Sequence, residues 1–510
     1  MNDAPIAASA PPARSASPGL FDRALRRIGL VWRDMAASVV GETDDSIEGQ
    51  IRACLNGHGG EVSARSRAAR LAETFESLGD AAQRDFLLTL AGFDSDPDTV
   101  DAAYATVRAA EDPAARAIAT AELRRALEPP RLRLLTQFTT IPDGRKFLVD
   151  LRAILLRSRR DDKRLAALES DLRGLLAAWF DIGFLELRRI DWSSPAALLE
   201  KLVDYEAVHA IRSWRDLKNR LDSDRRCYAF FHPRMPDEPL IFVEVALVKG
   251  LAGSVQLLLD EKAPVQDPRG ADTAIFYSIS NCQKGLAGIS FGNFLIKQVV
   301  ELLEAELRGL HSFATLSPIP GFRTWLDPLL DRSLAEPSRA GPLLDPARAG
   351  GPPNDEPPNG QRPSVQQVDL LTAEEASSLM SAMPAENGKQ ALAAIMAKRG
   401  WWREPGLSKT AGPVLERLCA RYLVHESAGK RARDPVAHFH LSNGARIERI
   451  NLHGDTSEKG AKESATLMVN YLYDPVRIDE YHEAYAGEGK RTASTAVRRL
   501  ARGAGGGGRA

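Results

Sequence analysis

The spacing of apolar residues changes along this chain, and the change limits the folds that it can adopt. Up to about residue 190, apolar residues return every three or four positions, as at Leu165, Leu168 and Leu172. This is the period of an amphipathic helix. From Cys227 onward the period drops to two, as in CYAFFH and PLIFVEVALV, which is typical of strands. The sequence therefore predicts an all-helical bundle domain followed by a mixed α/β domain.

Composition marks the ends of these predicted domains. Residues 1–19 are rich in Ala, Pro and Ser, and residues 335–367 are dominated by Pro and Gly. We expect a disordered tail in the first stretch and a flexible insert in the second. The predicted helical domain then covers 20–190, the α/β domain 191–485 and a C-terminal tail 486–510.

The totals exclude several classes of function. With 67 basic and 68 acidic residues among 510, the chain has a formal net charge of −1, so nucleic acid is not expected as its main partner. Its four cysteines are far apart and form no CxxC pair, which argues against a disulfide framework and a structural zinc site. No apolar run reaches the length of a membrane span. We expect a cytoplasmic protein without a membrane partner.

One loop has the character of a phosphate site. In YSISNCQKGLAGISFGNFLIKQVVELL (277–303), Gln283, Gly285 and Gly288 form a Q-x-G-x-x-G pattern between an alternating strand and an amphipathic helix. Small residues allow backbone N–H groups to approach an anion, and a helix start favours negative charge. Neither a Walker loop nor G-x-G-x-x-G is present. The pattern predicts a pyrophosphate site, although an ordinary glycine turn into a core helix explains it as well.

A serine in TLSPIPGFRTWL (315–326) is the second candidate. Ser317 ends a predicted strand, and Pro318 and Pro320 restrict the backbone that follows it. A helix-capping turn is the plainer interpretation. The turn nevertheless comes directly after the strand that follows the candidate phosphate helix, and ligands gather at such strand ends. Ser317 is therefore a candidate catalytic residue.

Three histidines lie in DPVAHFHLSNGARIERINLHGD (434–455), which we interpret as a strand, a turn at Asn443–Gly444 and a second strand. On a strand, His438 and His440 would share one face. No Cys, Asp or Glu falls at ligand spacing on that face, so a metal pair is disfavoured. One of His438, His440 and His453 is better suited to proton transfer near neutral pH.

Two tyrosines in ATLMVNYLYD (465–474) are also candidates. Tyr471 and Tyr473 would share one face of a predicted strand. They are either core side chains or phenols that hydrogen-bond a reacting carbonyl or orient a histidine.

Taken in order, these segments resemble the malonyl-CoA decarboxylase family. The matching stretches span about 225 to 475 and are RRCYAFFHPRMPDEPLIFVEVAL, AIFYSIS, QKGLAGISFGNFLIKQVV, LSPIPGF, DPVAHFHLSNGA, RINLHGDTSEKG and LMVNYLY. The resemblance implies a helical domain that assembles a homotetramer and a catalytic domain of the GNAT acetyltransferase fold. It also implies that malonyl-CoA is converted to acetyl-CoA and carbon dioxide without a metal or organic cofactor.

The resemblance also assigns roles to residues. The family's catalytic serine, histidine and tyrosine fall on Ser317, His440 and Tyr473. Its acyl-CoA loop covers Ala287 to Asn293. With the phosphate pattern, the predicted substrate-binding residues are Gln283, Gly285, Ala287, Gly288, Ile289, Ser290, Phe291, Gly292 and Asn293. Whether Ser317 or His440 donates the proton is left open.

Two other functions share these features. An acyltransferase would use the same loop to pass an acyl group from coenzyme A to an amine or alcohol. A helical scaffold with a degenerate acyl-CoA fold would bind the thioester without turnover. Incubation with malonyl-CoA and no acceptor separates the three hypotheses, because only a decarboxylase forms acetyl-CoA and carbon dioxide.

Overall fold

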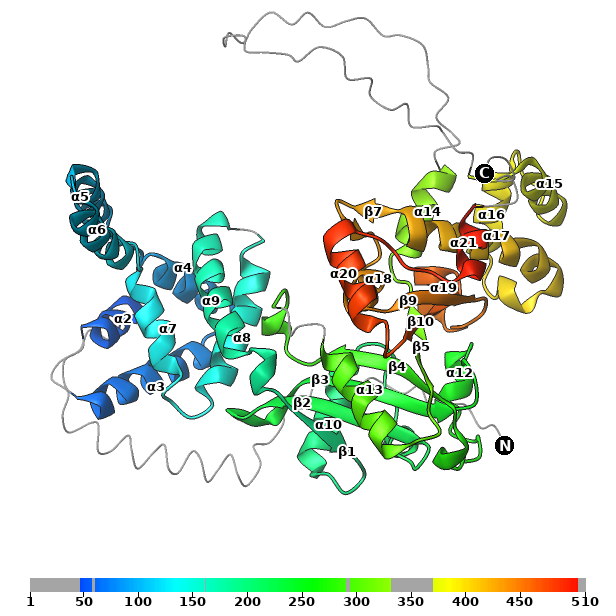
Figure 1. Cartoon of the computed structure of the whole chain (residues 1–510), viewed down its shortest axis with the longest axis horizontal. Coiled ribbons are helices and arrows are strands. Elements are labelled where there is room, and N and C mark those ends of the chain that lie inside the picture. Colours follow the sequence, from blue (N-terminus) through cyan, green and yellow to red (C-terminus); the bar gives the residue numbers. More distant parts are fainter. Residues whose placement is uncertain (1–45, 57–59, 161, 290–293, 332–369, 503–510) are drawn as a thin grey trace, which may run out of the picture. The chain divides into compact units, whose positions relative to one another are not determined.

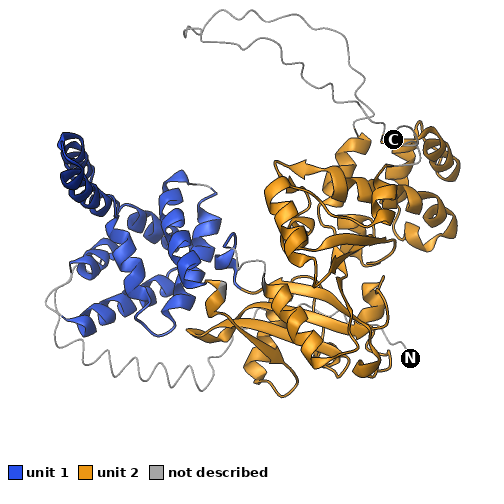
Figure 2. Cartoon of the chain, viewed as in Figure 1, with its two compact units in different colours: residues 1–180, 283–290 blue, residues 181–282, 291–510 orange. Residues whose placement is uncertain are grey.

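The computed structural model is drawn in Figure 1 and describes residues 46–56, 60–160, 162–289, 294–331 and 370–502. It forms two compact units, shown in Figure 2: Met1–Phe180 with Gln283–Ser290, and Asp181–Cys282 with Phe291–Ala510. We call them the helical unit and the sheet unit. The expected tail 1–19, the insert 335–367 and Ser290–Asn293 lie outside the described residues.

The helical unit is built from short amphipathic helices. They are α2 (Ile47–Leu55), α3 (Glu61–Ser77), α4 (Asp80–Ala91), α5 (Pro97–Ala109), α6 (Pro113–Ala126), α7 (Pro130–Phe138), α8 (Gly144–Ser158) and α9 (Ala166–Trp179). Helices α5 and α6 each begin with an Asp–Pro pair. The aspartate side chain accepts from backbone N–H groups of the first turn, and proline occupies the first helical position, where no N–H group is needed for the helix. Phe75, Phe86 and Phe147 pack edge to face in the core. The predicted bundle is confirmed.

The sheet unit contains one mixed eight-stranded sheet. Its strands are β1 (Glu186–Ile190), β2 (Arg225–His232), β3 (Met235–Val248), β4 (Thr273–Asn281), β5 (Ser312–Thr315), β6 (Ser317–Pro318), β9 (Arg446–Asn451) and β10 (Met468–Tyr473). The order is β1-β2-β3-β4-β5-β10-β6, and β9 also pairs with β10. Among the strand pairs that the structure describes in this sheet, only β4–β5 is parallel, and helix α13 (Phe294–Glu306) connects its two strands. The predicted mixed α/β domain is confirmed.

Further helices cover the sheet and extend the unit. They are α10 (Ala196–Tyr205), α11 (Trp214–Arg220), α12 (Val255–Leu258), α14 (Phe322–Asp331), α15 (Ala373–Ala382), α16 (Gly388–Ala397), α17 (Pro405–His425), α18 (Pro435–Ser442), α19 (Glu458–Ser464), α20 (Ile478–Glu488) and α21 (Thr495–Arg502). A small ribbon joins β7 (Ser427–Ala428) to β8 (Arg431–Ala432). Within the described ranges, no helix combines the length and apolar character that a membrane crossing needs.

The segment around the paired histidines is a helix, and our prediction of a strand and hairpin there was wrong. The Asp434 carboxylate accepts from the N–H groups of Val436 and Ala437, each at 3.0 Å, and Pro435 takes the first helical position. These are strong helix-start signals. Gly444, with a φ of 78°, ends the helix. A dipeptide such as Asn–Gly serves a helix end as well as a hairpin, because both need a positive φ.

Two other local sequence patterns are also misleading. The segment SVQLLLD (254–260) predicts a strand, but it contains the single helical turn α12, which buries Val255 and Leu258 on one face. Ser193 and Ser194, just before Pro195, are of a residue type that predicts a helix cap. Neither caps α10, because Pro195 occupies the cap position and the Ser194 hydroxyl accepts from the N–H of Asp191. At α12 the burial of Val255 and Leu258 overrides a weak strand preference, whereas before α10 a local hydrogen bond takes up the Ser194 hydroxyl.

The domain boundaries differ from those expected. Strand β1 pairs with β2 in the sheet, so the sheet unit begins before residue 190. Residues 486–502, expected as a tail, hold the end of α20 and helix α21, which buries Val497. Gln283–Ser290 groups with the helical unit, which the local sequence pattern did not indicate.

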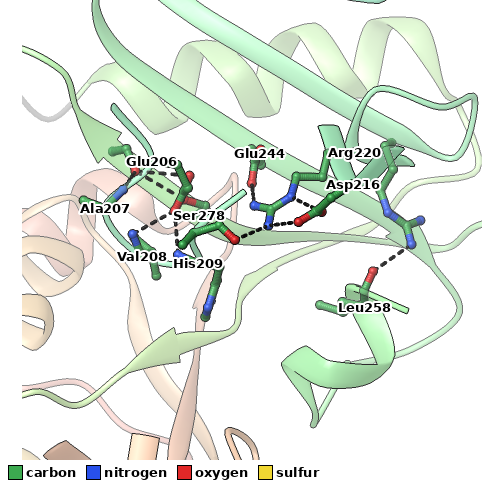
Figure 3. A network of polar contacts seen from close by, with 12 residues as sticks. Glu206, Ala207, Val208, His209, Asp216, Arg220, Glu244, Leu258 and Ser278 are labelled. Atoms are coloured by element: carbon green, nitrogen blue, oxygen red, sulfur yellow. Dashed lines mark hydrogen bonds and ion pairs between the residues drawn. The ribbon is translucent and has the colours of Figure 1, made fainter. Parts of the chain in front are cut away.

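A buried ion cluster ties α11 to the sheet (Figure 3). Arg220 donates to Asp216 at 2.9 Å and to Glu244 of β3 at 3.1 Å, and all three side chains are buried. Burial raises the pKa of Glu244 to about 8. The Arg220 guanidinium opposes this rise, and its own pKa is raised by Glu244 and Asp216. Nearby, Glu206 accepts from the Ser278 hydroxyl and closes the loop after α10 onto β4.

Replacing Arg220 with methionine should destabilise the sheet unit strongly. The change leaves Asp216 buried without its cation, which typically costs about 3–5 kcal/mol. Denaturant unfolding at neutral pH measures this loss. Arg269→Met is the matched control, because Arg269 pairs with Asp267 at the surface and is 84% exposed, and such pairs contribute about 0–1 kcal/mol. Equal stability of the two variants would contradict this role of Arg220.

Candidate active site

Three side chains selected by resemblance meet in one hydrogen-bond chain in the sheet unit. The Oγ of Ser317 lies 3.0 Å from Nε2 of His440, and Nδ1 of His440 lies 2.8 Å from the hydroxyl of Tyr473. Ser317 also donates to Oγ1 of Thr315 at 2.9 Å. The fold thus joins residues that are 123 positions apart in sequence. Their catalytic roles stay a prediction.

The direction of this chain follows from the donors available. Since the Ser317 hydroxyl donates to Thr315, its oxygen can only accept from His440. A neutral imidazole carries one N–H, so the proton belongs on Nε2, and Nδ1 accepts from Tyr473. This tautomer is inferred from the hydrogen-bond network. The hydrogen bonds then all run in one direction, from the Tyr473 hydroxyl through His440 and Ser317 to Thr315.

The side chains of the site are almost completely shielded from solvent. Ser317, His440 and Tyr473 are 6%, 3% and 1% exposed, and the ring of Tyr471 stacks on the imidazole with 4.6 Å between centroids. Burial lowers the pKa of His440 to about 3 and raises the pKa of Tyr473 well above its ordinary value. Both rings are therefore neutral near pH 7, because an ion would lose its hydration there.

The Asp434 carboxylate, which is not part of the hydrogen-bond chain, positions both the histidine helix and the turn after the serine. Asp434 caps helix α18, which carries His440, and its other oxygen accepts from the Gly321 N–H at 3.1 Å in the turn that follows Ser317. A Cβ at Gly321 would lie 2.2 Å from the Tyr422 hydroxyl, so glycine is needed for this close approach. Sequence reasoning missed Asp434, although the Asp–Pro pair before the histidines was a visible signal.

The other candidate histidines lie elsewhere. His438 contacts the Tyr485 hydroxyl at 2.8 Å. His453 lies between Ser408 at 2.7 Å and Thr466 at 3.0 Å. Among the described residues, no group of three or more His, Cys, Asp or Glu side chains is arranged to hold a metal. Of the three histidines left open by the sequence, the structure brings only His440 to Ser317.

The predicted substrate loop belongs to the helical unit, whereas the hydrogen-bond chain belongs to the sheet unit. In this loop Gln283, Gly285 and Ile289 are buried, and Ala287 and Gly288 are exposed. The loop therefore has a packed edge and a solvent edge. Its last predicted members, residues 290–293, lie outside the described residues.

Comparisons with protein families match most of the chain. The model described as malonyl-CoA decarboxylase C-terminal domain matches residues 183–342 and 361–507. The model described as malonyl-CoA decarboxylase N-terminal domain matches residues 93–180.

Curated relatives give the same result. The mitochondrial malonyl-CoA decarboxylase of Mus musculus is 34% identical over 442 residues, which cover 85% of this chain and 81% of the mouse protein. The protein of the same name from Anser anser anser is 37% identical over 351 residues, and the match covers 68% of this chain and 64% of the goose protein.

Solved structures share the architecture as well. The crystal structure of malonyl-CoA decarboxylase from Rhodopseudomonas palustris is similar with a TM-score of 0.75 and 38% identity, covering 90% of this chain and 100% of that one. The corresponding structure from Agrobacterium vitis has a TM-score of 0.74 and 37% identity, covering 89% of this chain and 99% of that one.

His440 should stay uncharged from about pH 5 to 8 because it is desolvated. In spectra of 15N-histidine protein, its ring signals should keep the pattern of the tautomer protonated at Nε2, with no titration in this range. The His440→Asn variant identifies the signals, and free histidine in the same buffers provides the titrating control. A midpoint between pH 5 and 8 would refute the dry, neutral site.

Proposed function

Because this chain belongs to the malonyl-CoA decarboxylase family, a family of lyases, we propose that it converts malonyl-CoA to acetyl-CoA and carbon dioxide. The observation that supports this reaction best is the buried chain Tyr473–His440–Ser317. The proposed reaction uses no metal and no organic cofactor, since the thioester of the substrate itself accepts the electron pair.

The reaction needs two things from the protein. When the bond to the carboxylate breaks, its electron pair moves into the thioester and forms an enolate, while carbon dioxide leaves. The barrier falls if the enolate oxygen is stabilised more than the ground-state carbonyl. The α-carbon must then receive a proton. A dry site with aligned donors suits both tasks, because hydrogen bonds are stronger where water is excluded.

We assign the proton to a relay through Ser317. The serine O–H proton passes to the α-carbon, and the Nε2 proton of His440 passes to the serine oxygen. For His440 to end neutral, it must begin as an imidazolium. Burial opposes that charge in the free protein, but the malonyl carboxylate would supply a nearby anion, which raises a histidine pKa. Substrate binding would therefore take up the one proton that the overall reaction consumes.

The solvent edge of the loop is the proposed coenzyme A site. Lys284, Ala287 and Gly288 are exposed there, so an ammonium group and backbone with little side-chain cover face solvent together. Such a surface suits a pyrophosphate. The GNAT-like character of the sheet unit, with this loop after β4, stays part of the proposal.

Assembly and location are also proposed. We propose a homotetramer built through the helical unit, in the cytoplasm, with a role in fatty-acid metabolism. Large apolar side chains are exposed on α5 and α6 and just after α6, with Tyr104 at 54%, Ile118 at 65% and Leu127 at 52%. Such side chains support an association surface.

The direct experiment incubates the purified chain with malonyl-CoA and no acyl acceptor. Acetyl-CoA and carbon dioxide should form in equal amounts. Malonyl transfer that occurs only after an amine or alcohol is added would instead indicate the acyltransferase, and binding without turnover would indicate the sensor. Either of these results would refute the proposed function.

His440→Asn should lower the turnover number by about 10²–10⁴ and leave coenzyme A binding intact, because the imidazole acts only in proton transfer. Proton uptake tests the imidazolium directly. Calorimetric titration of Ser317→Ala with malonyl-CoA in buffers of different ionisation enthalpy should show uptake of about one proton. The double variant with His440→Asn should lose this uptake, and its persistence would exclude His440 as the proton carrier.

A further inference from the structure

The loop that follows β4 is held by an arginine of the helical unit. Arg152 of α8 is 1% exposed. One of its terminal nitrogens, Nη1, donates to the carbonyl oxygens of Gly285 and Ala287 at 2.5 and 3.0 Å. Its other nitrogen, Nη2, donates to Glu169 of α9 at 2.7 Å, and Glu169 also contacts Arg159. The guanidinium is therefore paired with a carboxylate of α9, which helps to orient it toward the loop.

Two carbonyls facing the same guanidinium determine where the neighbouring N–H points. In a trans peptide the C=O and the next N–H lie on opposite sides. The Ala287 carbonyl faces Arg152, so the Gly288 N–H faces away from it. Gly288 is exposed, its φ is 75°, and nothing lies within 4 Å of a Cβ built on it. Within the described residues this N–H has no hydrogen-bond partner. Arg152 thus turns this backbone donor away from α8.

The inner side of the loop packs tightly against α8. A Cβ at Gly285 would lie 1.7 Å from the carbonyl oxygen of Val149 in α8, a distance that no real structure tolerates. Leu286 and Ile289 are buried beside it. The inner edge of the loop is therefore packed backbone to backbone on α8, and the outer edge is the part left for a ligand.

We propose that Arg152 is a positioning residue for coenzyme A: it holds the loop so that the Gly288 N–H donates to a phosphate oxygen of the carrier. The inference rests on the proposed function, since that function supplies the ligand. It gives the helical unit a role in substrate binding in addition to the assembly proposed above. Arg152 itself is buried behind the loop and does not touch the phosphate.

The test compares two lysine substitutions of buried arginines. Arg152→Lys keeps the charge for Glu169 but loses the planar fork that orients the group. Arg131→Lys is the matched control: Arg131 is 2% exposed, lies in the same unit, and bonds Asp171 at 2.7 Å and the Ala91 carbonyl at 3.0 Å, neither of which belongs to the loop. Both variants should lose similar thermal stability, so stability alone cannot explain a difference in binding.

Coenzyme A itself is the binding probe, measured by calorimetry. Arg152→Lys should raise its Kd by about tenfold, as expected for weakening a hydrogen bond to a charged group, and should raise the KM for malonyl-CoA with little change in kcat. Gly285→Ala should act in the same direction, because its methyl group lifts the loop from α8. Arg131→Lys should leave Kd and KM unchanged.

Two results would overturn the proposal: an unchanged Kd in Arg152→Lys, or an equal rise of Kd in Arg131→Lys. These results can be distinguished from a failure of the proposed decarboxylase function. If the parent protein binds coenzyme A but does not turn over malonyl-CoA, the function fails while the binding comparison still decides the role of Arg152. If the parent turns over malonyl-CoA and Arg152→Lys keeps the parent Kd and KM, only the role of Arg152 fails.

Discussion

The register of β10 is the constraint on which the candidate site depends. Val469 of β10 lies opposite Ser317 of β6. The serine therefore lies beside the start of β10, and Tyr473 lies at the end of the same strand. Asn470 donates from its side chain to the Thr315 carbonyl at 2.7 Å and so locks this register from the other face. A slip of one residue would reverse every side chain of the strand. The tyrosines would then leave the imidazole, and the hydrogen-bond chain would be lost.

Desolvation links this architecture to the proposed chemistry. The histidine lies where an ion is unfavourable, so the resting imidazole is neutral, and both of its nitrogens are hydrogen-bonded. An anionic substrate would reverse that preference by bringing its own charge. Within the helical unit, Arg152 orients the backbone of the loop that we propose for coenzyme A.

Much of the fold could be predicted because its signals are local. The helical period before residue 190 and the alternation in β2, β3 and β4 depend only on neighbours in sequence. The serine at the predicted strand end was recognisable from the two prolines that follow it. The helix α18 was not, because Asn443–Gly444 gives the same signal for a hairpin and for a helix end. The pairing of His440 with Ser317 came from resemblance to a family, since no local pattern selects one histidine of three.

The sequence by itself determined the element types, the small-residue loop and the residue chemistry available, because these follow from periodicity and from side-chain type. Only the tertiary structure decided which groups meet. Asp434 reaches Gly321, and Arg152 reaches Gly285 across 133 positions. Such contacts depend on strand register and on the burial of polar groups that must find partners. Neither property is encoded in any short stretch of the chain, and so the site became visible only when the fold was complete.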